Sequence, residues 1–192
     1  MNRFFFHFHL LRTKKRAWFF SSLFAFYILA QAPFIPTVSL WLRHHNLLRV
    51  SLLVLLFLFL GYLLAYFFSA LNITKVRAYF GIAFLLGISL LFFMIQKRSI
   101  EERIHIMEFA FLTLLFFKAA KFSFQGFLIY AIPLLLAITI GWLDEIWQAI
   151  LPNRIYDIQD VCDNAFGSLV GIGFAWIRQK YGKEINLNES HS

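Results

Sequence analysis

Long apolar runs separated by short polar segments dominate the pattern of this chain. Most of the runs approach the roughly 20 apolar residues that an α-helix needs to cross a bilayer. The predicted spans cover residues 17–36, 50–71, 78–95, 104–117, 127–143 and 161–177. The pattern therefore predicts an all-α fold, a polytopic transmembrane helical bundle of about six spans.

The run over residues 104–117 differs from the others because it is shorter and carries His105 and Glu108. Ionisable side chains in membrane helices usually face the interior of the protein. We therefore expect this helix to be surrounded by protein rather than by lipid. Glu101 adds to the pattern, since Glu101, His105 and Glu108 follow the i, i+4, i+7 spacing of one helix face.

The most polar stretch of the chain, residues 144–171, lies between two apolar runs. Its first part is helical in pattern, because Asp144 and Gln148 are four residues apart and share one helix face. Pro152 then ends the helix, since proline cannot continue the hydrogen-bond ladder. This arrangement predicts a polar hairpin between two apolar helices.

The second part of this stretch opens the last predicted helix. Asp160 and Asn164 are again four residues apart, and Gly167 and Gly171 lie one and two turns further along the same stripe. The two glycines form a G-x-x-x-G pattern, which lets another helix backbone approach closely. We interpret them as packing residues.

Composition agrees with a membrane protein. The chain is 60% hydrophobic and 20% aromatic, with a mean hydropathy of +0.70. Its net charge of +8 comes from Lys and Arg in short segments between the runs, which favours positive-inside topology over nucleic-acid binding. The single cysteine, Cys162, excludes an intrachain disulfide, and its carboxylate neighbours disfavour a reactive thiolate.

The distribution of Lys and Arg predicts the orientation of the spans. With six spans and the N-terminus inside, twelve of the 18 basic residues lie inside and six outside. This bias places both termini in the cytoplasm and eight of the ten acidic residues outside. A cleaved signal peptide is an alternative for the first run, because Ala30-Gln31-Ala32 resembles a cleavage site, although Pro33 disfavours cleavage.

In this orientation, polar residues of three predicted helices meet at the outer side of the membrane. We expect them to form a site, because intramembrane ionisable residues generally serve function. The candidate ligand-binding residues are Glu108, Asp144, Glu145, Gln148, Arg154, Asp157, Asp160 and Asn164. The candidate catalytic residues, which could exchange protons, are His105, Asp144 and Asp160.

Individual roles within this set allow alternatives. Asp144 and Glu145 lie about 100° apart on a helix, so we expect Asp144 to face inward and Glu145 to lie at the rim. His105 is either a titrating group or an interhelical hydrogen-bonding residue. Arg154 either neutralises Asp157 and Asp160 or holds a phosphate or carboxylate of a ligand.

A metal site is the weakest of the candidate chemistries. His105, Glu108, Asp144 and Asp160 would offer the oxygen-rich set that Mg²⁺ or Ca²⁺ prefers. A single histidine without a ligand-spacing motif argues against zinc. We expect no metal and no cofactor.

Residues 144–167 contain the pattern D-E-x-x-Q followed by R-x-x-[polar]-x-x-D-x-x-x-N-x-x-G. The matching positions are Asp144, Glu145, Gln148, Arg154, Asp157, Asp160, Asn164 and Gly167. This pattern resembles the signature of the VanZ-like family of small membrane proteins, and His105 resembles a family histidine that opens an earlier helix. Asn153 stands where the family often has glycine, at a turn where either residue suits.

The resemblance divides the chain into four parts. It covers residues 78–178, the VanZ-like membrane core. A basic N-terminal segment at 1–16 and two helices within 17–77 precede this core, and a polar tail follows at 179–192.

The VanZ-like family is related to a teicoplanin-resistance protein. The resemblance thus implies a bacterial inner-membrane protein with an accessory or binding role in the cell envelope, whose outward site engages an amphiphilic molecule. An alternative is an enzyme acting on a lipid-linked envelope precursor, and a small permease is a third reading. The expected partners are the lipid bilayer and such a molecule, not nucleic acid, and the oligomeric state is left open.

Overall fold

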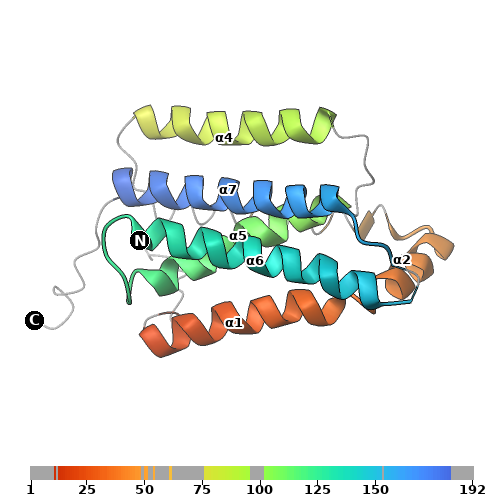
Figure 1. Ribbon diagram of the computed structural model, residues 1–192. Helices are drawn as coiled ribbons and strands as arrows, with labels where there is room; N and C mark the ends of the chain where they lie inside the picture. Colours follow the sequence, from red (N-terminus) through yellow and green to blue (C-terminus); the bar gives the residue numbers. More distant parts are fainter. Residues whose placement is uncertain are drawn as a thin grey trace, which may run out of the picture.

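The computed structural model describes residues 11, 13–48, 50, 51, 54, 61, 76–95, 102–152 and 154–182, without the side chains of residues 102 and 103. Within these residues the fold is all-helical, as predicted. The helices are α1 (Lys14–Gln31), α2 (Ile35–His44), α4 (Val76–Ile95), α5 (Glu102–Ala120), α6 (Leu128–Ile150) and α7 (Ile158–Tyr181) (Figure 1). Most of the predicted span at 50–71, and Glu101, lie outside the described residues.

Helix α5 forms the centre of the bundle and packs against α1, α6 and α7. Phe109, Leu112 and Ala119 of α5 have no exposed surface. The helix is therefore surrounded by protein, which confirms the expectation drawn from its short apolar run. Phe109 and Leu112 belong to a core with Ala25 and Ile28 of α1 and Ala137 of α6.

Close packing of α5 on α7 depends on the two glycines predicted to serve that role. A Cβ atom on Gly167 would collide with the carbonyl oxygen of Ile106, and one on Gly171 with the carbonyl oxygen of Ala110. The two backbones touch at these points, so the G-x-x-x-G pattern brings α7 directly onto α5. This contact fixes the position of the polar residues that precede Gly167.

Helix α4 forms an outer layer that packs on α7 (Figure 1). Phe92 of α4 stacks on Phe166 of α7 with ring centroids 3.9 Å apart, and Leu85 covers Gly173. The opposite face of α4 is exposed and apolar, with Phe80 and Met94 among its residues. Such a face suits contact with lipid.

The first predicted span, residues 17–36, is not one straight helix. Helix α1 ends at Gln31, α2 begins at Ile35, and the two are bent by 64°. Pro33 and Pro36 explain the break, because proline lacks the N–H that would continue the α1 ladder but is tolerated in the first turn of a helix.

Membrane-spanning character is present in part of the described chain. By length and composition, α4 and α6 could each cross a membrane, and α1 with α2 could do so as one bent span. Two or three membrane-spanning helices are thus supported among the described residues, whereas the predicted count of six stays a prediction.

Candidate functional site

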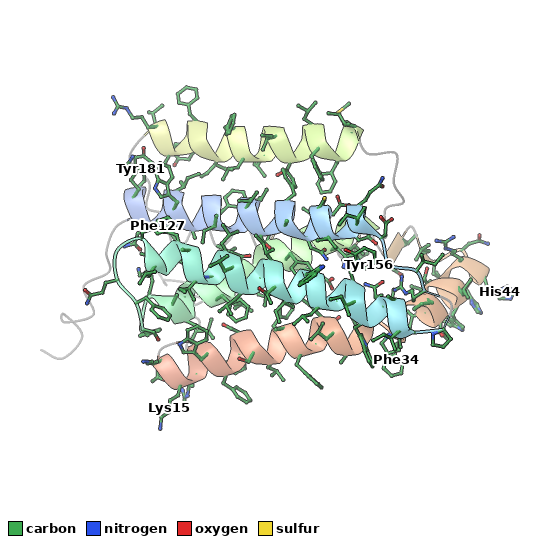
Figure 2. The ribbon with its side chains drawn as sticks, in the orientation of Figure 1. Lys15, Phe34, His44, Phe127, Tyr156 and Tyr181 are labelled. Carbon is green, nitrogen blue, oxygen red and sulfur yellow. The ribbon has the colours of Figure 1, made fainter. Side chains whose placement is uncertain are left out.

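The polar residues singled out from the sequence gather at one end of the bundle. Helices α1 and α6 end there, while α5 and α7 begin there (Figure 1). Phe34 and Tyr156 lie at this end and Lys15 at the opposite end (Figure 2). We call the group of polar side chains contributed by these helices and by the segment between α6 and α7 the polar cluster.

Gln148 is the centre of the part of the cluster contributed by α6. Its Nε2 donates to Asp144 Oδ2 at 2.9 Å and to Glu145 Oε1 at 3.0 Å. All three side chains are buried, and Glu145 has no exposed surface. The expectation that Glu145 lies at the rim was therefore wrong. Residues 144 and 145 lie four and three positions before 148, so the Gln148 side chain, which leans toward the N-terminus of the helix, can bond both carboxylates.

Glu145 also ties the last helix to α6. Its Oε2 accepts a hydrogen bond from the backbone N–H of Asp157 at 3.3 Å. Asp157 in turn is the N-cap of α7, accepting from the N–H of Gln159 at 2.8 Å. Glu145 and Asp157 were both predicted from the sequence to bind a ligand. Their hydrogen bonds hold the segment between α6 and α7 in place.

Helix α5 contributes a His–carboxylate pair. Nδ1 of His105 lies 3.6 Å from Oε2 of Glu108, and both side chains are mostly buried. The other oxygen of Glu108 accepts from Nε2 of Gln31, at the end of α1, at 2.9 Å. Asp144 and Glu145 both lie within electrostatic reach of His105. The structure therefore brings the α5 and α6 residues together.

Arg154 lies in the segment between α6 and α7 and is half-buried. The positive charge of Arg154 acts electrostatically on Asp144. Its Nε atom has no hydrogen-bond partner among the described residues. The sequence paired Arg154 with Asp157 and Asp160, and the structure adds Asp144 as a carboxylate on which the charge of Arg154 acts.

Helix α7 presents Asn164 and Asp163 to the bundle, each 1% exposed. Nδ2 of Asn164 donates to the carbonyl oxygen of Gly141 at 3.4 Å. Asp160, in the first turn of α7, is only half-buried, although it lies within electrostatic reach of Glu145. Asp160 is therefore at the edge of the cluster and Asn164 at its inner wall.

Two residues of the cluster were missed by sequence reasoning. Asp163 lies four residues before Gly167 and so on the packing stripe of α7, a spacing that could have revealed it. Gln31 lies at the end of α1, outside the resemblance to the VanZ-like family. Its only signal was a lone amide at the end of an apolar run.

Several buried polar atoms of the cluster have no hydrogen-bond partner among the described residues. Oδ1 of Asp144 and Oδ1 of Asn164 have no hydrogen-bond partner within the described part of the chain. Buried polar atoms in proteins are nearly always bonded, so such atoms mark positions where a ligand could bond. Over the described ranges, no three His, Cys, Asp or Glu side chains are arranged to hold a metal ion.

Comparison with protein-family models, with curated proteins and with solved structures gives no match to this chain. The resemblance to the VanZ-like family therefore rests on the residues of the polar cluster themselves.

Proposed function

We propose that this chain is a VanZ-like protein of the bacterial inner membrane with about six spans and both termini in the cytoplasm. Its polar cluster binds the polar head of an amphiphilic molecule of the cell envelope. In this role the protein acts as an accessory or binding protein, related in function to glycopeptide resistance.

The observation that carries this proposal is the buried Asp144 carboxylate. Its Oδ2 atom is held by Gln148, while Oδ1 has no partner among the described residues. Burying an unbonded polar atom costs about 1–3 kcal/mol. A ligand that donates a hydrogen bond to Oδ1 would recover that cost. The unbonded Oδ1 of Asn164 offers a second acceptor in the same cluster.

Charge distribution supports the orientation. Basic residues lie at the end of the bundle opposite the polar cluster, where α1 and α4 begin and where α5 and α7 end (Figure 1). They are Lys14, Lys15, Arg16, Arg77, Lys118, Arg178 and Lys180. Under the positive-inside rule this distribution favours an orientation with that end in the cytoplasm and the polar cluster near the outer surface.

A membrane enzyme acting on a lipid-linked envelope precursor is the second candidate. The proximity of His105 and Glu108, with Nδ1 3.6 Å from Oε2, favours it, because an imidazole close to a carboxylate is a common arrangement for proton transfer. The substitution His105→Gln separates the two functions. It keeps hydrogen-bonding capacity but removes titration, so an enzyme would lose activity while a binding protein would remain functional.

Teicoplanin susceptibility of a bacterial host that expresses the protein tests the proposal. Wild type should raise the inhibitory concentration several-fold over the empty vector, and Asp144→Asn should remove that increase at an equal membrane level. Cys162→Ser, at an exposed position, is the control and should behave as wild type. Full resistance with Asp144→Asn would refute a role for the cluster.

A further inference from the structure

An apolar groove with a volume of 540 Å³ lies along the seam between α1 and α5. This volume falls within the range of about 300 to 1,000 Å³ typical of ligand sites. Its lining includes Leu23, Phe24, Tyr27 and Ala30 of α1 and Phe111 and Leu115 of α5.

The groove follows two antiparallel helices toward the polar cluster. The ring of Trp18 lies 6.2 Å from that of Phe116, and Phe24 lies 5.1 Å from Phe111. Gln31 bonds Glu108 at the end of the same seam. The α1 residues that line the groove extend to Ala30, directly before Gln31. From Leu23 to Ala30 the helix rises about 10 Å.

Tyr27 connects the groove to the polar cluster. It lines the groove and also lies within electrostatic reach of Glu108. Ala30 lines the groove and the next residue, Gln31, bonds Glu108, so this end of the groove lies close to the carboxylate along α1. One elongated molecule could place an apolar chain in the groove and a polar head at Glu108 and Asp144.

The charge of the polar cluster determines which head group of an amphiphilic ligand it can bind. Glu108 and Glu145 each act electrostatically on Asp144 or are acted on by it, and Arg154 is the arginine whose charge acts on Asp144. Oε2 of Glu108 and Oδ1 of Asp144 are buried acceptors without a hydrogen-bond partner in the described part of the chain. Carboxylates in excess of cations attract an ammonium group and repel a phosphate. A chain-bearing amine matches both parts of the site, whereas an ordinary phospholipid matches only the groove.

We propose that the ligand of this protein is an amphiphilic amine whose hydrocarbon chain lies in the groove between α1 and α5 and whose ammonium group bonds the carboxylates of the polar cluster. This inference rests on the proposed function and specifies its ligand class. It also makes α1 part of the binding site.

Photolabelling of the full chain in phosphatidylcholine nanodiscs tests the inference. The probe is dodecylamine with a diazirine at the end of its chain, and labelled peptides are mapped by mass spectrometry. The label should lie on the α1 and α5 residues of the groove, several-fold above the exposed face of α4. Leu23→Trp fills the groove and should lower labelling several-fold, whereas Leu135→Trp, on an exposed position of α6, should not.

The head group is tested with chain-matched dodecanol and dodecyl phosphate probes. The amine should label the groove several-fold more than either, and Asp144→Asn should remove the preference. Equal labelling by all three probes would mean that the groove holds bulk hydrocarbon only, which overturns the inference.

The same experiment separates this inference from the proposed function. Labelling of the groove no greater than that of α4, with amine binding still dependent on Asp144, would refute the groove and leave the cluster as a binding site. Labelling independent of both Leu23 and Asp144 would refute both.

Discussion

The contact of Gly167 with α5 gives the most direct prediction about packing. In Gly167→Ala the new Cβ would lie 2.9 Å from Cα and 3.0 Å from the carbonyl carbon of Ile106 and would also collide with its carbonyl oxygen. These are backbone atoms, so no side-chain rotation relieves the clash. Overpacking of this kind costs about 1–3 kcal/mol. The substitution should therefore lower the free energy of unfolding by that amount.

Gly87→Ala on α4 is the matched control, because nothing lies within 4 Å of the position of its new Cβ. There the substitution only raises helix propensity, by up to about 1 kcal/mol, and should leave the protein as stable or more stable. Unfolding in mixed micelles by titration with sodium dodecyl sulfate, followed by circular dichroism, measures both values. Equal changes in the two variants would show that α5 and α7 do not touch at Gly167.

Three further predictions concern the cluster and the topology. The double-mutant cycle of Asp144→Asn and Arg154→Ala should give a coupling free energy of about 0.5–3 kcal/mol, and additive losses would show that the two charges do not interact. Gln31→Leu should destabilise the protein by about 0.6–2 kcal/mol in the same unfolding titration, whereas an unchanged value would remove α1 from the cluster. A C-terminal alkaline phosphatase fusion should be inactive and a C-terminal fluorescent protein should glow, and an active phosphatase would overturn the six-span topology.

The positions of the helices were largely predictable because apolar runs mark them directly. The predicted span 161–177 lies inside α7, and the span 127–143 lies inside α6 apart from Phe127, which is the N-cap of that helix. The end of α6 was also predictable, because Asp144 and Gln148 continue the helical spacing beyond the apolar run and Pro152 follows shortly after Ile150, where α6 ends. The break between α1 and α2 was missed although Pro33 and Pro36 marked it, because hydropathy does not depend on backbone geometry.

The composition of the polar cluster was predictable only in part. Spacing along one helix correctly grouped Asp144 with Gln148. It failed for Glu145, because a side chain that bends back along the helix is not described by the angle of its Cα position. Gln31 could not be placed, since its bond to Glu108 joins residues 77 positions apart and depends on how α1 packs against α5.

Native mass spectrometry of the full chain, purified from its host in mild detergent, tests most directly whether the polar cluster binds an amphiphile. The wild-type protein and the control Gly87→Ala should carry a bound molecule of lipid size, and Asp144→Asn should lose most of it while remaining folded. An equal amount of bound molecule in the wild type and in Asp144→Asn would contradict the assignment of the cluster as the binding site.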